Sequence, residues 1–264
     1  MAELGTALAA NALFVGALML TTWLLSLRLR NASIVDVVWG LGFASIALAT
    51  AALAQGAPPR RALIAALAGV WGLRLAGYLF WRNAGKPEDY RYQAMRRAWG
   101  ARFPVISLFT VFGLQGVLMF LISLPLQLAA VAHEPTQLGA LDALGAGLWL
   151  AGMGFEAIGD LQLTRFKADP RNAGRVLDTG LWRYTRHPNY FGDCLVWWGF
   201  FAIALAVPGG IFTVVSPIAM TVLLRRVSGV TLLERSLAKR KPGYADYMAR
   251  TRPFVPGPPR WRAR

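Results

Sequence analysis

Long apolar stretches alternate with short polar ones along this chain. A helix needs about 20 mostly apolar residues to cross the hydrocarbon core of a bilayer. Seven segments meet or approach that requirement, and they are residues 7–27, 34–54, 62–81, 105–130, 138–161, 190–207 and 209–224. The pattern therefore predicts an all-α integral membrane protein with seven transmembrane helices.

The ends of this pattern carry two further expectations. The sixth and seventh segments are short, and "PGG" (208–210) joins them, which predicts a tight hairpin. Residues 1–6 lack the basic start and the cleavage site of a signal peptide, so we expect the first segment to be retained as a span.

Composition agrees with a membrane protein and argues against a metal site. Of the 264 residues, 56% are hydrophobic, which is too apolar for a soluble domain of this length. Cys194 has no second cysteine with which to form an internal disulfide, and His133 and His187 lie far apart in the sequence. We therefore expect no metal centre.

Basic residues set the expected orientation. With seven spans, 25 of the 28 Lys and Arg residues fall on one side of the membrane, and the other side holds Arg60 and Arg61. The positive-inside rule then places the N-terminus outside and the C-terminus in the cytoplasm. The basic residues lie in short loops without a nucleic-acid-binding module, so we expect contact with anionic membrane lipid and none with nucleic acid.

Acidic residues inside the spans are more informative, because the positive-inside rule does not require them. Glu156 and Asp160 are four residues apart, as are Asn189 and Asp193, so each pair shares a helix face. A charge at a helix centre costs about 2.5–3.5 kcal/mol, which predicts that these groups face a cavity or a partner. Carboxylates beside a basic loop suit a nucleotide cofactor, although an ion network that only fastens the helices explains the spacing as well.

Two stretches of sequence make a family resemblance visible. "TGLWRYTRHPNYFGD" (179–193) before an aromatic-rich span, and "LLERSLAKRKPGYADYMARTRPFVP" (232–256), resemble the steroid 5α-reductase and sterol reductase superfamily, especially its bacterial members. The resemblance covers about residues 105–256. It implies a single membrane domain over residues 1–264. Within it, the N-terminal spans in 1–104 would form the substrate side of the site, the reductase-like part 105–256 would form the cofactor side, and 257–264 would be a basic tail.

The resemblance implies NADPH as the cofactor, held in a pocket that opens to the cytoplasm. Asn189 and Asp193 are expected at the nicotinamide. The other cofactor residues that it implies are Asp160, Lys167, Arg175, Tyr184, Arg186, His187, Glu234 and Tyr244. The basic residues of 165–186 favour NADPH over NADH, because they could bind the additional 2′-phosphate.

The substrate half of the site is implied by the first four spans. Asp36 in "SIVDVVWGLGF" occupies the place of a family carboxylate that engages a substrate carbonyl, and a protonated Asp36 is expected to donate to it. Alternatively, Asp36 is a solvated helix end near Arg28. The family tyrosine aligns with Trp71 or Gly72, so Tyr78, nearly two turns on, is the expected catalytic partner. Substrate contacts are expected from Asp36, Trp39, Phe43 and Gln115.

These expectations describe an NADPH-dependent reductase that transfers hydride to the C=C bond of a lipophilic enone, such as a 3-oxo-Δ4 steroid. Membrane methyltransferases of the isoprenylcysteine and phospholipid type share an Arg-His-Pro-x-Tyr-x-Gly element and bind S-adenosylmethionine, so they remain an alternative. A transporter that uses the polar cluster for permeation is a second one. We expect a monomer in the inner membrane of a bacterium, or in the endoplasmic reticulum of a eukaryote.

Overall fold

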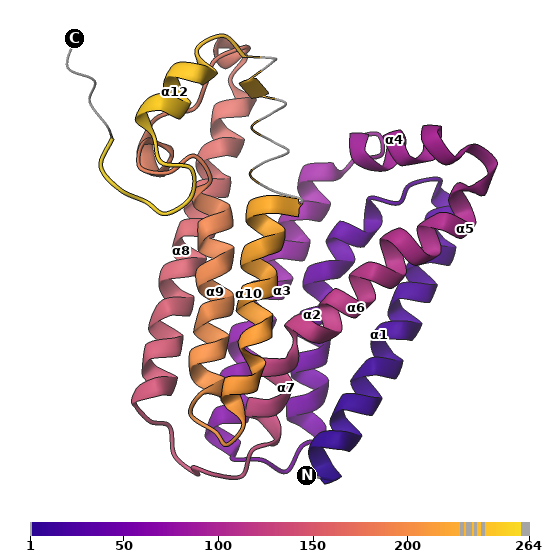
Figure 1. Cartoon of the computed structure of the whole chain (residues 1–264), viewed down its shortest axis with the longest axis vertical. Coiled ribbons are helices and arrows are strands. Elements are labelled where there is room, and N and C mark those ends of the chain that lie inside the picture. Colours follow the sequence, from indigo (N-terminus) through magenta and orange to yellow (C-terminus); the bar gives the residue numbers. More distant parts are fainter. Residues whose placement is uncertain (1, 228–229, 231–233, 235–236, 239–240, 260–264) are drawn as a thin grey trace. The chain divides into compact units, whose positions relative to one another are not determined.

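The structure is a computed structural model that describes residues 2–227, 230, 234, 237–238 and 241–259 (Figure 1). Every regular element within these residues is helical. The first half of the chain forms α1 Ala2–Leu29, α2 Ile34–Leu53, α3 Pro58–Asn83, α4 Tyr90–Trp99, the 3-10 turn η1 Gly100–Arg102, α5 Phe103–Ser107, the π-helix η2 Leu108–Gly113, α6 Leu114–Ile122 and α7 Leu124–Val131. The second half forms α8 Ala140–Ala168, η3 Pro170–Asn172, η4 Gly180–Arg183, α9 Pro188–Ala204, η5 Gly210–Val214, α10 Val215–Val222, the π-helix η6 Leu223–Val227 and α12 Tyr244–Arg250.

Five helical stretches within the described residues are long and apolar enough to cross a membrane. They are Ala2–Leu29, Ile34–Leu53, Pro58–Asn83, Tyr90–Val131 and Ala140–Ala168. These stretches overlap the first five predicted spans. Helix α9, with 17 residues, and the helical run 210–227 lie where the sixth and seventh were predicted. The described part of the chain is therefore all-helical with five candidate membrane spans, as expected of a membrane protein, and the count of seven and the orientation stay predictions.

Two connections differ from the prediction. Residues 82–104 were expected to form a loop, but they contain α4, which Asp89 caps by accepting from the Arg91 backbone N–H at 2.9 Å. Helix α8 continues to Ala168 instead of ending at 161. Its 29 residues extend about 43 Å, so it is longer than the roughly 30 Å hydrocarbon core.

The chain divides into two compact units. Unit 1 contains residues 1–142 and 203–216, and unit 2 contains residues 143–202 and 217–264. In unit 1, α2 and α3 approach closely at Gly40 and Gly72. A Cβ on Gly40 would lie 2.5 Å from the Gly72 carbonyl oxygen, and a Cβ on Gly72 would lie 2.4 Å from that of Gly40. Glycine at both positions therefore lets the two backbones pack together.

The core of unit 1 combines aromatic packing with a buried polar network. Phe43 and Trp71 are fully buried, with ring centroids 5.8 Å apart. In the same unit, Asn11 on α1 donates to Thr50 Oγ1 on α2 at 2.8 Å and to Gln127 Oε1 on α7 at 2.9 Å. All three polar side chains are buried, so their hydrogen bonds fasten three helices to one another in an apolar setting.

In unit 2, α8 and α9 run side by side (Figure 1) and approach closely at Gly152 and Gly192. A Cβ on Gly152 would lie 2.6 Å from the Gly192 carbonyl oxygen. Such distances do not occur in folded proteins, so a side chain at this position forces the helices apart.

This close approach predicts that Gly152→Val destabilises unit 2 by about 1–3 kcal/mol, the usual cost of overpacking. Gly154→Val is the matched control, because it places the same side chain on the same helix where no atom lies within 4 Å of the added Cβ. Unfolding of both variants in mixed micelles, followed by circular dichroism, measures the difference. Equal stabilities would contradict the close packing of α8 on α9.

Candidate functional site

Each unit contains a cluster of polar side chains built around residues that the sequence analysis associated with chemistry. The first, which we name the Asp36 cluster, consists of Asp36, Arg91, Tyr92 and Gln115 in unit 1. The second, the motif cluster, lies in unit 2 and consists of Asp160, Arg186, His187, Asn189 and Glu234.

Asp36 lies in the first turn of α2 and is an acceptor on both oxygens. Tyr92 Oη donates to Asp36 Oδ1 at 2.9 Å, and Arg91 Nη2 donates to Oδ2 at 3.1 Å. Gln115 Nε2, from α6, donates to Tyr92 Oη at 3.3 Å. Tyr92 is 6% exposed, and the Asp36 side chain is 20% exposed. A carboxylate, a phenol and a carboxamide from three helices therefore form a single hydrogen-bonded cluster.

The segment before α4 holds Arg91 and Tyr92 against Asp36. Glu88 accepts from the Ala32 backbone N–H at 2.7 Å and from both Nε and Nη2 of Arg96, at 3.0 and 2.9 Å. Burial would raise the pKa of the Glu88 carboxyl, but the hydrogen bonds from Arg96 and Ala32 hold it below its ordinary value. Asp89 binds Arg91 Nε at 2.8 Å. Glu88 is thus a charged clamp between α4 and the connection of α1 to α2.

Asp36 has a partner that the sequence did not predict. The hydroxyl of Tyr92 on α4 donates to it at 2.9 Å. Tyr78 is half-buried, and its ring lies 5.5 Å from the guanidinium carbon of Arg74 and from that of Arg82. Two donors, Arg91 and Tyr92, reach the two oxygens of Asp36, which is the pattern of an acceptor carboxylate. The catalytic roles of Asp36 and Tyr78 stay predictions.

The other expected substrate residues have distinct environments. Phe43 is fully buried, and Trp39 is half-buried with its ring centroid 5.2 Å from that of Phe43. Gln115 is joined to Asp36 through Tyr92. Sequence reasoning missed Tyr92, although the N-cap Asp89 and the spacing of Tyr92 and Arg96 on one helical face could have identified α4.

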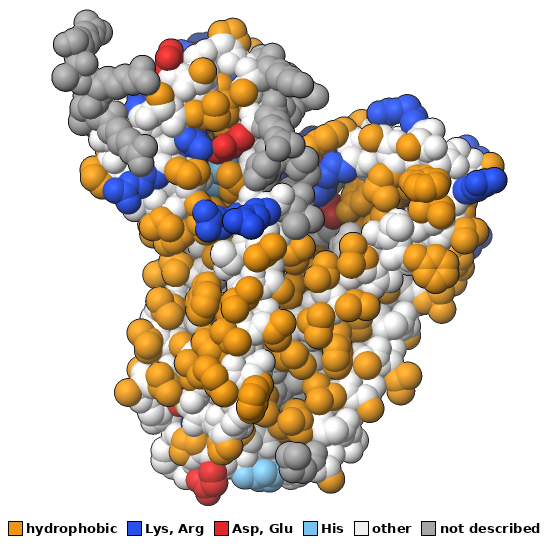
Figure 2. Space-filling view, viewed as in Figure 1, with side chains coloured by type: hydrophobic (Ala, Val, Ile, Leu, Met, Phe, Trp, Pro, Cys, Tyr) orange, Lys and Arg blue, Asp and Glu red, His pale blue; other side chains and the backbone are white. Residues whose placement is uncertain are grey.

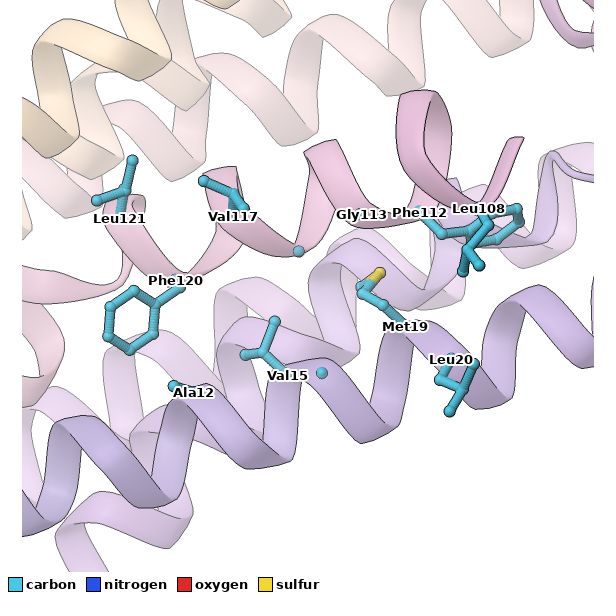
Figure 3. A pocket seen from close by; sticks show the side chains of 12 residues that line it. Ala12, Val15, Met19, Leu20, Leu108, Phe112, Gly113, Val117, Phe120 and Leu121 are labelled. Carbon is cyan, nitrogen blue, oxygen red and sulfur yellow. The ribbon is translucent and has the colours of Figure 1, made fainter. Parts of the chain in front are cut away.

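An apolar cavity of about 350 Å³ lies in unit 1 between α1 and the η2–α6 segment (Figure 3). Its lining is entirely apolar side chains and glycines: Ala12, Val15, Gly16, Met19, Leu20, Leu108, Phe112, Gly113, Gly116, Val117, Phe120 and Leu121. Gln115 of the Asp36 cluster directly precedes Gly116 of this lining. The cavity has the size and the surface chemistry for a lipophilic molecule.

The motif cluster of unit 2 is built around Arg186, which is 8% exposed. Its Nε donates to Glu234 Oε1 at 2.7 Å and its Nη2 to Glu234 Oε2 at 3.1 Å. Its Nη1 donates to the carbonyl oxygens of Met248 and Thr251, both at 2.8 Å. The guanidinium is therefore engaged by the protein itself, and it fastens the C-terminal segment to the segment before α9.

His187 completes this arrangement. Its Nε2 lies 3.1 Å from Glu234 Oε1, and its ring stacks on Tyr190 with centroids 5.5 Å apart. Burial lowers the pKa of His187 more than Glu234 raises it. Burial alone would raise the pKa of Glu234, but His187 and Arg186 hold it below its ordinary value. We therefore assign a neutral imidazole that donates its Nε2–H to a charged Glu234.

Asn189 and Asp160 are brought together by the packing of α9 on α8. Asn189 Nδ2 donates to Asp160 Oδ1 at 3.1 Å, and Asp160 is 5% exposed. Asp193 lies one turn beyond Asn189 on α9, with its Oδ1 buried. A carboxamide and carboxylates thus follow one face of the α8–α9 pair, as their four-residue spacings indicated.

The remaining expected cofactor residues differ in exposure. The side chains of Lys167, Arg175 and Tyr184 are exposed. Tyr244 is 3% exposed, and burial raises its pKa to about 12, so its phenol stays protonated. Among the described residues no group of three or more His, Cys, Asp and Glu side chains could hold a metal ion.

The two depressed pKa values predict that acid destabilises unit 2. Below the ordinary values of 6.5 for His187 and 4.5 for Glu234, the unfolded chain binds protons that the folded protein does not. Stability is therefore present above pH 6.5 and falls as the pH falls, by at most about 1.4 kcal/mol per pH unit for each group. Denaturation midpoints from pH 8 to pH 5 measure this loss.

His187→Gln should flatten that profile between pH 6.5 and pH 5. His133→Gln is the control, because His133 is the other histidine and its side chain is 63% exposed. If His133→Gln flattened the pH dependence of stability and His187→Gln did not, burial of His187 would not be the cause of the acid destabilisation.

Comparison with known proteins places the chain in a family without assigning an activity. An uncharacterized protein of Schizosaccharomyces pombe is 27% identical over 204 residues, which cover 68% of this chain and 59% of that protein. The chain thus spans less than two thirds of the length of this relative. No solved structure matches the chain significantly. Residues 22–251 match the family described as "Protein of unknown function (DUF1295)". This matched range includes the residues of both polar clusters. The chain belongs to the DUF1295 family.

Proposed function

We propose that the protein is an NADPH-dependent membrane reductase that reduces the C=C bond of a lipophilic enone, such as a 3-oxo-Δ4 steroid. The observation that carries the proposal is the hydrogen-bonded set of Tyr92, Asp36 and Gln115 in a unit that also contains a wholly apolar cavity. Reduction of an enone by hydride develops negative charge on the carbonyl oxygen, and a phenol positioned by two partners can stabilise that charge. The resemblance of residues 179–193 to steroid 5α-reductases supports the same reaction.

The residues of the motif cluster fit NADPH in their chemistry. Asn189 and Asp160 offer a carboxamide and a carboxylate, which can pair with the carboxamide of a nicotinamide. Lys167 and Arg175 are exposed cations suited to phosphates. The ion pair of Arg186 with Glu234 acts as a scaffold that holds the C-terminal segment beside these groups. Bound there, NADPH would supply the hydride.

The chain's own residues supply positioning and a proton. Tyr92 Oη, which donates to Asp36 in the structure, turns its hydrogen toward the substrate carbonyl oxygen as charge develops on it. Gln115 Nε2 keeps its hydrogen bond to Tyr92 Oη and so holds the phenol in place. Arg91 keeps Asp36 an acceptor, which orients the phenol between reactions. The apolar cavity excludes water from the reacting carbonyl.

The membrane arrangement that goes with this function has seven crossings. We propose that α9 and the helical run 210–227 are the sixth and seventh, each shorter than the first five. By the positive-inside rule, the distribution of basic residues along the sequence favours an outside N-terminus and a cytoplasmic C-terminus. NADPH is available on the cytoplasmic side. In a bacterium this membrane is the inner membrane, and in a eukaryote it is that of the endoplasmic reticulum.

A binding competition with the detergent-purified protein tests the proposal. We expect NADPH to bind more tightly than NADH, and we expect no competition from S-adenosylmethionine. A panel of steroidal and non-steroidal enones should then oxidise NADPH, followed by its absorbance. Tight binding of S-adenosylmethionine would favour the methyltransferase instead, and binding of neither cofactor would remove both enzymes.

A further inference from the structure

Helix α4 has one face that packs on the other helices of unit 1 and one face that is exposed. Tyr92 on the packed face binds Asp36, and Arg96 binds Glu88 and lies 4.4 Å from the centroid of the Phe103 ring. Ala94, Arg97 and Ala98 are on the exposed face. The packed face is therefore fixed by charge and by aromatic contact, whereas the other face is open.

The exposed face is basic and aromatic. Arg97 and Arg102 are exposed, and neither has a hydrogen bond or an ion pair with any residue that the structure describes. Tyr90 is 54% exposed and Trp99 is 47% exposed. By contrast, Arg91 and Arg96 on the packed side are bound to acidic side chains. The two outer arginines are thus available to an external partner.

This face lies where the membrane-spanning part of unit 1 ends. Trp23 Nε1 on α1 donates to the Pro104 carbonyl oxygen at 2.9 Å, which places the residues after α4 against the C-terminal half of α1. The exposed Arg28 and Arg30 follow on α1 and the turn after it. Figure 2 shows Lys and Arg side chains gathered around α4, next to an apolar surface.

That apolar surface continues directly from the basic one. Leu25 on α1 is 48% exposed, Val105 on α5 is 61% exposed, and Phe109 on η2 is 68% exposed. Large apolar side chains with such exposure on membrane-spanning helices face lipid. A basic and aromatic surface that borders lipid-facing side chains meets the headgroup region of the bilayer.

We propose that the exposed face of α4, together with the η1 turn that follows it, is a docking surface for the headgroups of anionic phospholipids. Arg97 and Arg102 bind the phosphates, because guanidinium groups form charge-assisted hydrogen bonds with them. Trp99 and Tyr90 lie at the boundary between headgroups and acyl chains, as aromatic side chains do at membrane interfaces. The same short helix presents Tyr92 to Asp36 on its other face, so the bound lipid steadies the helix that carries the phenol.

Short-chain lipids and one labelled position test this surface. Ala98→Cys introduces a cysteine beside Arg97, and the native Cys194 is 4% exposed, so a polarity-sensitive fluorophore attaches selectively at 98. Dihexanoyl phosphatidylglycerol and dihexanoyl phosphatidylcholine are titrated into the labelled protein in detergent. We expect saturable fluorescence changes with phosphatidylglycerol at concentrations where phosphatidylcholine has no effect.

Removal of the arginines should weaken this binding in a graded way. Each of Arg97→Gln and Arg102→Gln should raise the half-saturating phosphatidylglycerol concentration by about fivefold, the effect of one basic residue near an anionic surface. Arg183→Gln is the matched control, because it removes an exposed arginine of unit 2. Arg97→Lys and Arg102→Lys keep the charge and should retain most of the affinity, which separates lost binding from lost folding.

Three results would overturn the proposal. Equal responses to the two lipids would show that headgroup charge is not recognised. The same response to inorganic phosphate alone would indicate an anion site without a lipid surface. An unchanged titration in the Arg97→Gln, Arg102→Gln double variant would place the lipid elsewhere. None of these readouts requires turnover, so the inference stands or falls independently of the reductase proposal.

Discussion

Tyr92→Phe should lower the turnover of an enone substrate by about 10²–10³, the usual effect of removing one donor to a developing oxyanion. The substitution removes only the hydroxyl that donates to Asp36 Oδ1 and accepts from Gln115 Nε2. Because the ring stays in its buried position, the fold and the affinity for NADPH should be retained. Steady-state oxidation of NADPH, together with equilibrium binding of NADPH, measures both quantities.

Two other tyrosines make this experiment specific. Tyr90→Phe removes a hydroxyl from the exposed side of the same helix, and it should leave turnover unchanged. Tyr78→Phe removes the hydroxyl that the sequence analysis expected to be catalytic. A large loss with Tyr78→Phe and a small one with Tyr92→Phe would return the donor role to α3. Loss of NADPH binding with Tyr92→Phe would instead indicate a structural role for the phenol.

The helices of the structure follow from the sequence where the pattern depends on the bilayer. Residues 34–54 were predicted as a span and form α2 over Ile34–Leu53, because an apolar run of that length has few alternatives. Helix α4 was not predicted, since its sequence is basic and polar and carries no membrane signal. Its position depends on Asp89 as an N-cap and on contacts with Asp36 and Glu88, which are distant in sequence.

The polar residues show the same division. The four-residue spacing of Asn189 and Asp193 and of Glu156 and Asp160 placed each pair on one helix face, and the structure joins Asn189 to Asp160. The motif suggested that Arg186 binds a cofactor directly. In the structure all three of its side-chain nitrogens donate within the protein, to Glu234 and to two backbone carbonyls, which a local motif cannot reveal. Spacing identifies faces, whereas tertiary contacts decide what each side chain binds.

The two polar clusters also differ in how they are held. The motif cluster is anchored from within by Glu234, which pairs with Arg186 and lies 3.1 Å from His187 Nε2. The Asp36 cluster is held from outside by Glu88, which clamps α4 to the connection between α1 and α2. If the reductase proposal is correct, a change at Glu88 should alter turnover through the position of Tyr92.

The buried ion pair of Arg60 and Asp142 should give the largest loss of stability in unit 1. Both side chains are almost fully buried, at 0% and 1% exposure. Arg60 Nε and Nη2 donate to Asp142 Oδ1 and Oδ2 at 2.9 and 3.0 Å. Arg60 also donates to the carbonyl oxygens of Pro135 and Gln137, at 2.8 and 3.1 Å. This single guanidinium therefore fastens α3 both to the loop before α8 and to the first turn of α8.

Arg60→Leu should destabilise the protein by about 3–5 kcal/mol, because it leaves a buried carboxylate without its counter-charge. Asp142→Leu should cost a similar amount, since it strands a buried guanidinium. The double variant should cost much less than the sum of the two, because two buried groups that bind each other are lost together. Unfolding in mixed micelles, followed by circular dichroism, gives all three values.

Arg61→Leu is the control: Arg61 neighbours Arg60 in sequence and has no ion pair with a residue that the structure describes. The proposal would be contradicted if the stability loss of the double variant equalled the sum of the two single losses. The ion pair would then not act as one unit, and only the hydrogen bonds from Arg60 to backbone carbonyls would hold the loop before α8.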